Sequence, residues 1–139
     1  MINVLDGEYL LQVCEKTVQY FSDNTSVDTY HKFLRCGILE NRIFVLATVD
    51  DNENMTSCEV LCLGQDLMNR LTITVDFMWI DPHYPHLFKN YLEYTEKLVQ
   101  EKGIKRIIIP TYKNEKAFER KYGRYGFTRA YTVFEKKVT

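Results

Sequence analysis

The sequence predicts a single α+β domain in which a mixed central sheet carries helices on both faces. Residues 71–109 read as a strand, a proline-bounded corner, a long amphipathic helix and a second strand. Such a βαβ unit places two parallel strands in one sheet. Residues 42–63 read as an antiparallel hairpin that follows two helices. A hairpin joined to a βαβ unit makes the sheet mixed, and the helices then form the outer layers.

Size and composition are those of an ordinary globular protein, with 45% apolar and 27% charged residues in 139. This length is enough for one domain, and no linker or repeat divides residues 1–139. The 18 basic and 19 acidic residues nearly balance, so we expect neither nucleic acid nor a membrane as a partner. We find no signal peptide and no run long enough to span a bilayer, so we expect a cytoplasmic protein (host cytoplasm or virion for a viral one).

The cysteines predict a reducing compartment. Cys58 and Cys62 are the closest of the four and lie on a predicted strand, where four residues span ~13 Å. This distance is too long for a disulfide or a shared metal ion. We therefore expect four buried thiols, the other two being Cys14 and Cys36.

Two helices open the chain. Residues 7–21 repeat apolar side chains at steps of three and four, with Asp6 as a candidate N-cap. A second helix is expected to begin at Ser26, whose hydroxyl can cap it, and to stop at Gly37 in the left-handed conformation.

Three strands follow with a period of two. Residues 42–49 and 56–63 flank an acidic turn at 50–54 and form the hairpin. From Leu71 to Ile80 apolar and polar residues alternate. We expect one face of this strand to be buried throughout, and it comprises Leu71, Ile73, Val75, Phe77 and Trp79.

The second half of the chain continues with a helix over about 85–102, which has a wide apolar arc and ends at Gly103. A strand at 105–109 consists largely of isoleucine, as expected of a strand covered on both sides. Asn114 can cap a short helix that runs to about Tyr122. Residues 127–137 are predicted to form a final strand.

This order of elements resembles the GNAT (Gcn5-related N-acetyltransferase) fold, and three motifs strengthen the resemblance. WIDPHY at 79–84 looks like the end of the family's fourth strand, and KGIKRIII at 102–109 looks like the turn into its fifth. NxxA at 114–117 followed by YGRYGF at 122–127 is similar to the family's N-x-x-A…Y-x-K-x-G-F motif, with one extra residue between the halves. The resemblance covers about residues 42–138. It implies acetyl-coenzyme A (acetyl-CoA) as cofactor and a primary amine as acceptor.

The chain departs from the family at the loop that binds the pyrophosphate of acetyl-CoA. The family uses R/Q-x-x-G-x-G/A, in which glycines let successive backbone N–H groups converge on the phosphates. Here the stretch is PHLFKN at 85–90, which has no glycine and is about two residues shorter. Pro85 has no N–H to donate. The sequence therefore predicts a degenerate cradle, in which His86 and Lys89 can supply compensating positive charge.

The resemblance also assigns roles to individual residues. Tyr122 falls on the position that protonates the leaving thiolate, and Asn114 on one beside the pantetheine arm. The backbone of Met78, Trp79 and Ile80 falls where the family pairs with the pantetheine amides. Each has a structural alternative: Tyr122 can pack against Phe118, Asn114 can act as a helix cap and Trp79 can belong to the core.

Two acids in strands are candidates for the base that deprotonates the amine. They are Asp76 and Glu59, each expected in the middle of a strand, where a carboxylate can accept a proton directly or through water. The alternative for both is a solvated or hydrogen-bonded strand residue.

Two further clusters have structural alternatives. Asp81, His83 and His86 have the spacing of metal ligands, but no fourth ligand suggests itself, so we expect no metal. A basic run near the C-terminus can hold an acidic partner or the 3′-phosphate of coenzyme A, or be a solvated face; it consists of Lys116, Arg120, Lys121, Arg124, Arg129, Lys136 and Lys137.

Two main functions are therefore open, and a third, a nucleic-acid-binding domain, rests only on the basic run near the C-terminus. The first is an acyltransferase that uses acetyl-CoA on a primary amine. The second is a binding or assembly module that keeps the fold without the chemistry, such as an accessory or virion protein of a phage, with a protein partner or a second copy of itself. The missing glycines and the ten tyrosines available for an interface favour the second.

Overall fold

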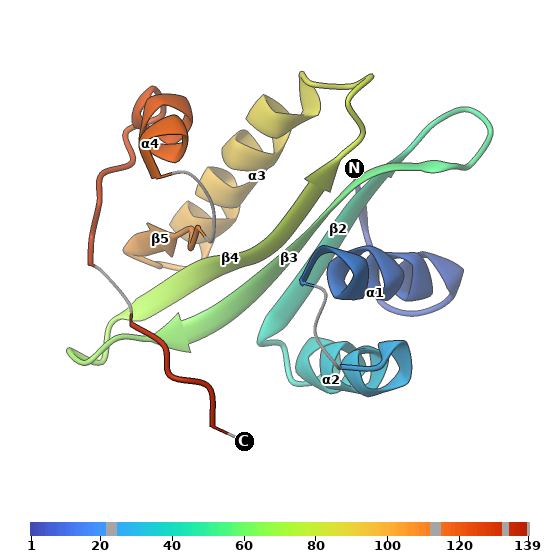
Figure 1. The fold of residues 1–139 in the computed structure, drawn as a ribbon, viewed down its shortest axis with the longest axis horizontal. Coiled ribbons are helices and arrows are strands. Elements are labelled where there is room, and N and C mark those ends of the chain that lie inside the picture. The colour runs from blue at the N-terminus through green and yellow to red at the C-terminus, as the bar shows by residue number, and fades with distance from the viewer. Residues whose placement is uncertain (22–24, 112–114, 132–133, 139) are drawn as a thin grey trace.

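The computed structural model describes residues 1–21, 25–111, 115–131 and 134–138. Its sheet has the strand order β1-β2-β3-β4-β5, in which β1 to β4 are antiparallel neighbours and β5 is parallel to β4. The mixed sheet and the α+β class are therefore as predicted (Figure 1). In chain order the elements are β1 (Ile2–Asn3), α1 (Glu8–Phe21), α2 (Val27–Leu39), β2 (Ile43–Val49), β3 (Met55–Gln65), β4 (Leu71–Ile80), α3 (Leu87–Glu101), β5 (Arg106–Ile108) and α4 (Glu115–Gly123).

Two hydrophobic cores lie on opposite faces of the sheet. Helices α1 and α2 cover one face, where Leu10 and Leu34 pack against β2 and β3. Helix α3 covers the other, where Tyr91 packs against Ile73 and Leu61. Figure 1 shows the resulting three layers, with α4 beside α3. The outer layers thus fix which side chains of each strand are buried on which side.

Gly37 does not end α2, so that prediction is wrong. The helix runs to Leu39, and the left-handed residue is Asn41, with φ 58°. Gly37 is instead a close-packing position, since a Cβ there would lie 2.2 Å from Cδ1 of Ile43. The start of the helix is as predicted, because the Ser26 hydroxyl accepts a hydrogen bond from the Thr29 N–H at 3.1 Å.

A β-bulge in β4 overturns the prediction that its alternating apolar residues share one face. Val60 of β3 pairs with Phe77 and Leu61 pairs with Val75, so Asp76 has no partner in β3. One extra residue reverses the alternation beyond it. Ile73 and Val75 therefore belong to the core under α3. Phe77 belongs to the core under α1 and α2, where Trp79 also packs.

Strands β4 and β5 pair over three residues only. Thr72–Thr74 pairs with Arg106–Ile108, whereas residues 75–80 of β4 continue without a strand on that side within the described part of the chain. Figure 1 shows β4 extending well past β5. The edge of β4 over residues 75–80, here called the free β4 edge, is therefore open to another hydrogen-bonding group.

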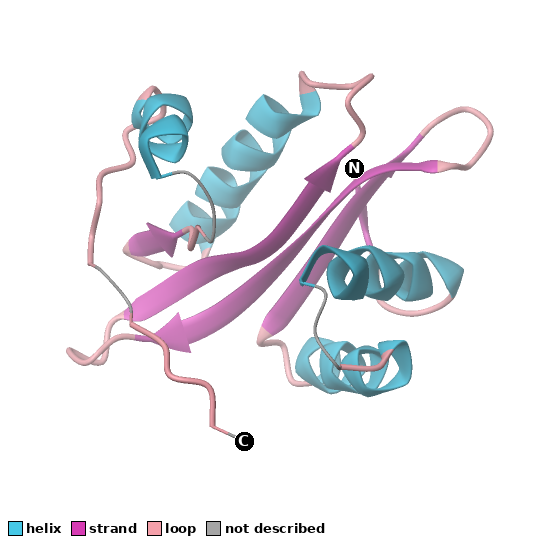
Figure 2. Ribbon diagram, in the orientation of Figure 1, coloured by secondary structure: helices cyan, strands magenta, loops and turns pink. Residues whose placement is uncertain are grey.

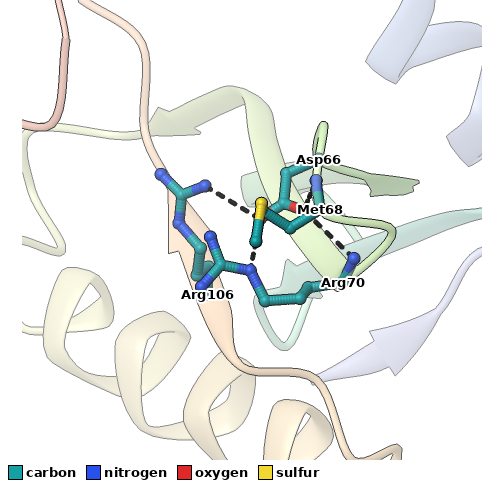
Figure 3. Close-up of polar contacts among 4 residues, drawn as sticks. All are labelled: Asp66, Met68, Arg70 and Arg106. Atoms are coloured by element: carbon teal, nitrogen blue, oxygen red, sulfur yellow. Dashed lines mark hydrogen bonds and ion pairs between the residues drawn. The ribbon is translucent and has the colours of Figure 1, made fainter.

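An aspartate holds β5 against the β3–β4 turn (Figure 3). The carboxylate of Asp66 accepts from Nε of Arg70 at 2.8 Å and from Nη1 of Arg106 at 3.3 Å. It also accepts from the backbone N–H groups of Met68 and Arg70. These hydrogen bonds, led by the one from the Arg70 backbone, lower the pKa of Asp66 to about 2.

The predicted final strand at 127–137 is absent from the described residues 127–131 and 134–138, which Figure 2 draws as loop. Gly126 has a φ of 86°, and the N–H of Phe127 bonds back to the carbonyl of Tyr122. Nη2 of Arg129 then donates to Glu119 at 2.8 Å. The chain as far as Arg129 is thus held against α4, and alternation alone cannot make a strand without a neighbour to pair with.

The cysteines only partly match the prediction. Cys14 and Cys58 are buried, Cys62 is half-buried and Cys36 is exposed, so four buried thiols was wrong. Burial raises the pKa of Cys14 to about 11 and that of Cys58 to about 12. Among the described residues, no helix is both long and apolar enough to cross a membrane.

Candidate functional site

Helix α4 brings Tyr122 to the end of β4. The Tyr122 ring is buried in a small cluster with Phe88 and Leu92 of α3, and Met78 and Ile80 of the free β4 edge pack against this cluster. The chain reaches this point because α4 packs on α3 and against the edge of the sheet. Tyr122, α3 and the free β4 edge therefore lie together, as the resemblance implied.

Aromatic packing holds the Tyr122 ring from three sides. It stacks on Phe118 with 4.1 Å between the ring centroids, and meets Phe88 at 5.2 Å and Phe127 at 5.6 Å edge to face. The predicted packing with Phe118 is confirmed. Burial, and then the charges of Glu59 and Tyr20, raise the pKa of Tyr122 to about 12. The phenol therefore keeps its proton at neutral pH.

The three residues of β4 named for cofactor binding are fixed by pairing with β3 on their other side. Met78 pairs with Glu59, Trp79 with Cys58 and Ile80 with Ser57. Trp79 turns its side chain to the α1 face, where Nζ of Lys16 lies 4.1 Å from its ring centroid. Core packing of Trp79 is thus confirmed.

The amino end of α3 forms a closed turn. The N–H of Leu87 donates to the carbonyl of Tyr84 at 3.1 Å, and that of Phe88 to Pro85 at 3.4 Å. His86 is the N-cap residue, but it has a helical φ of −64° and makes no capping hydrogen bond. Two N–H groups that a helix start would offer to an anion are therefore already engaged.

The charged side chains around this turn are mostly paired. Lys89 lies 3.9 Å from Glu93 in an exposed ion pair. Asp81 accepts from the backbone N–H of His83 at 2.9 Å and lies 2.8 Å from its Nδ1, and these bonds lower the pKa of Asp81. His86 has its ring beside Tyr84 instead. Across the described residues, no group of three metal-binding side chains forms.

Glu59 is sealed beneath α3. Thr95 donates to its Oε1 at 2.9 Å, whereas its Oε2 has no hydrogen-bond partner among the described residues. Burial raises the pKa of Glu59 to about 8, and the Thr95 hydrogen bond opposes this only in part. Beside it, the hydroxyls of Ser57 and Tyr91 lie 2.7 Å apart. The carboxyl is therefore mostly protonated at pH 7.

Asp76 has the opposite environment. It is the bulge residue, it is exposed, and it lies near Cys62 and Tyr30 on the face covered by α1 and α2. Burial and then the Asp76 carboxylate raise the pKa of the Cys62 thiol to about 12. The two predicted bases are thus on opposite faces of the sheet. Asn114 lies outside the described residues.

Comparison with known proteins identifies the fold. No family model matches the sequence, and no curated protein resembles it closely enough to count as a match. A solved structure described as a probable acetyltransferase superposes with a TM-score of 0.76, covering 100% of this chain and 99% of its own at 11% identity. An acetyltransferase of Trypanosoma brucei gives 0.73, with 99% of both chains covered at 14% identity. The aminoglycoside 6′-N-acetyltransferase AAC(6′)-Ih of Acinetobacter baumannii gives 0.72 at 9% identity, covering 99% of this chain and 97% of its own.

The chain has the GNAT fold. Strands β4 and β5 are paired over only three residues. Beyond that pairing, Tyr122 lies together with Met78 and Ile80 of β4. The structure does not bring Glu59 to the surface, nor Asp76 to the α3 face.

Sequence reasoning missed several polar and aromatic residues of this GNAT fold near Glu59 and Tyr122. Thr95 and Ser57 make polar contacts under α3, and a signal existed, since Ser57 and Glu59 stand at alternate positions of one predicted strand. Tyr20 was also missed. It lies in the last turn of the amphipathic helix α1, where no sequence motif marks it.

Proposed function

We propose that the chain is a GNAT-fold N-acyltransferase that moves an acetyl group from acetyl-CoA to a primary amine. The observation that carries the proposal is the free β4 edge with the Tyr122 cluster at its side. An exposed strand edge binds an extended amide-bearing chain by main-chain hydrogen bonds, and pantetheine is such a chain. The three solved structures named above are described as acetyltransferases, one of them as a probable one, which supports the same reaction class.

In this proposal each part of acetyl-CoA meets a different element. The backbone of Met78 and Ile80 pairs with the pantetheine amides, which puts the thioester beside Tyr122. Lys89 and His86 at the start of α3 meet the pyrophosphate, because the N–H groups of Leu87 and Phe88 are engaged. An open hollow of about 650 Å³ on α4, lined by Lys116, Glu119 and Arg120, offers two cations for further phosphate.

The reaction forms a bond between the amine nitrogen and the carbonyl carbon and breaks the bond from that carbon to sulfur. The amine must first lose a proton, and Asp76, which solvent reaches, is the better acceptor of the two acids. Glu59 already holds a proton at pH 7, because burial raises its pKa to about 8. The amine proton therefore passes to Asp76 through water.

Tyr122 acts on the leaving sulfur. Its pKa of about 12 exceeds that of an ordinary thiol, about 8.5, so complete proton transfer to the thiolate is uphill by about 5 kcal/mol in the unliganded site. A hydrogen bond from the phenol to the developing thiolate needs no such transfer and stabilises the transition state. The proposal thus assigns Tyr122 the role of hydrogen-bond donor; the phenol keeps its proton, and the departing thiolate takes one from water.

Calorimetry and kinetics test the proposal. Titration with acetyl-CoA should give a saturable heat, and millimolar acetyl-CoA should raise the melting temperature. Tyr122→Phe should keep this binding and lower acetyl transfer to amines by about 10²-fold or more. Tyr125→Phe is the matched control, since Tyr125 also meets Phe88 edge to face but is exposed. Absence of heat and of thermal stabilisation would reject the acyltransferase.

The second candidate is a GNAT-fold binding or assembly module without catalysis. The closed turn at the start of α3 favours it, because Leu87 and Phe88 direct their N–H groups to Tyr84 and Pro85 rather than outward. This module would bind a protein partner or a second copy of itself. A monomer whose acetyl transfer vanishes in Tyr122→Phe would exclude it. A stable complex or oligomer with no acetyl-CoA binding would support it.

A further inference from the structure

Three aromatic rings meet where α1 ends over the bulge of β4. Tyr20 and Phe21 contact each other edge to face at 5.0 Å, and both contact the Phe77 ring, at 5.6 Å and 6.3 Å. Phe77 is buried, whereas 46% of Tyr20 and 37% of Phe21 are exposed. We call these residues the ring cluster. Because the two half-exposed rings pack on a buried ring, they form a fixed apolar surface that a ligand can contact at a low entropic cost.

The ring cluster lies across the free β4 edge from Tyr122. Phe77 belongs to the core under α1, and Tyr122 packs on α3 at the opposite face. Tyr20 is nonetheless close enough to Tyr122 to contribute to the raised pKa of that phenol. Strand β5 pairs with β4 only over Thr72–Thr74, so no described strand borders β4 at Phe77 on that side. A ligand at the ring cluster therefore borders the place proposed for the thioester.

The charges around the ring cluster favour a cation. The carboxylate of Asp76 is exposed on the same face, one residue before Phe77. The last turn of α1 has no basic residue, so its carbonyl groups add a partial negative charge there. Lys16, one turn earlier on α1, lies over Trp79, towards the end of β4. Aromatic faces beside a carboxylate are a common arrangement for binding an organic ammonium ion.

We propose that the ring cluster and Asp76 bind the acceptor, and that they select a primary amine carried on an aromatic or bulky apolar body. The ammonium group lies towards Asp76 and the free β4 edge, and the apolar body covers Tyr20 and Phe21. This inference rests on the proposed function for its reaction, but amine binding can be measured without it. Small hydrophilic amines leave the two exposed rings uncovered and bind less tightly.

The test compares phenethylamine with ethylamine, which has the same amine and lacks the ring. Trp79 is the chain's single tryptophan and packs in the same core as Phe77, so its fluorescence reports binding without acetyl-CoA. Phenethylamine should bind at least tenfold more tightly than ethylamine. Tyr20→Ala should weaken phenethylamine binding about three- to tenfold and leave ethylamine unchanged, because one aromatic contact is lost. Tyr20→Phe keeps the aromatic ring and should bind phenethylamine as tightly as the wild type does.

Two controls complete the design. Tyr131→Ala removes another exposed tyrosine, beyond α4, and should change neither Kd. Asp76→Asn should weaken both amines by a similar factor, since both carry the ammonium. Equal affinity for the two amines, or no effect of Tyr20→Ala in a variant whose circular dichroism matches the wild type, would overturn the inference.

The inference and the proposed function fail in different ways. If phenethylamine binds as expected while acetyl-CoA does not, the ring cluster is an amine site and the acyltransferase is rejected. If acetyl transfer occurs with equal kcat/KM for both amines, the acyltransferase is supported and the selectivity proposed for the ring cluster is rejected.

Discussion

Substituting Glu59 by glutamine should change how the stability of the protein depends on pH. Glu59 is fully buried under α3, and only one of its two carboxyl oxygens has a hydrogen-bond partner among the described residues. Glutamine has nearly the same shape, and its amide oxygen can accept the hydrogen bond from Thr95. The substitution therefore removes the titration of this side chain and leaves the packing in place.

The magnitude follows from the two states of the carboxyl. Its pKa is about 8 in the folded protein, against 4.5 for an ordinary glutamate. Between these values the unfolded chain has released the proton and the folded chain still holds it, so the free energy of unfolding falls as pH rises. The decline begins near pH 4.5, ends as pH passes 8 and amounts to about 5 kcal/mol at most. Below pH 4.5 this contribution is fully present.

Urea denaturation at pH 5, 6.5 and 8 measures the effect. Glu59→Gln should flatten the decline, so that the variant is more stable than the wild type at pH 8 by several kcal/mol and differs little at pH 5. Other titrating groups cancel in the difference between the two proteins. Glu93→Gln removes an exposed glutamate of α3 and should keep the wild-type slope. A difference in stability between Glu59→Gln and the wild type that stays constant from pH 5 to 8 would refute the burial argument.

Three further predictions concern the fold and the phosphate contact. Gly37→Ala should destabilise the protein by about 1–3 kcal/mol in denaturant titrations, because its Cβ would overlap β2, whereas Gly123→Ala, with nothing within 4 Å, should not. Asp66→Ala should lower the free energy of unfolding and speed amide hydrogen exchange in β5, since two arginines and two N–H groups lose their acceptor; unchanged exchange would remove its anchoring role. Lys89→Ala should raise the Kd for acetyl-CoA several-fold by calorimetry, and Lys97→Ala, later on α3, should not; equal effects would argue against a phosphate contact at Lys89.

Much of the fold was predictable because its elements are set by local periodicity. The bounds of β4 and α1 agree with the sequence to within one residue, and α3 begins two residues later than predicted. The bulge could not be predicted, since the sequence around Asp76 alternates without a break and only the pairing with β3 reveals the extra residue. The prediction that Gly37 ends α2 failed because glycine is used both for a left-handed helix end and for a close approach between two elements.

The site was predictable where it depends on the backbone and not where it depends on burial. The free β4 edge and the neighbourhood of Tyr122 follow from the order of the elements. The difference between Asp76 and Glu59 does not, because both are acids in the middle of a strand. Helix α3 seals Glu59, and the bulge exposes Asp76 on the opposite face. Which helix covers which strand position is a long-range property that local patterns do not carry.

The bulge at Asp76 also bears on how this protein can evolve. Deleting that one residue would remove the bulge and leave the neighbouring pairs in place, because Leu61 already pairs with Val75 and Val60 with Phe77. In the regular strand that results, Val75 would still lie beneath α3 and Phe77 beneath α1. The bulge thus accommodates one extra residue, an exposed carboxylate, without exchanging side chains between the two cores. The fold should therefore tolerate deletion of Asp76, and the loss should fall on the amine binding proposed for this carboxylate.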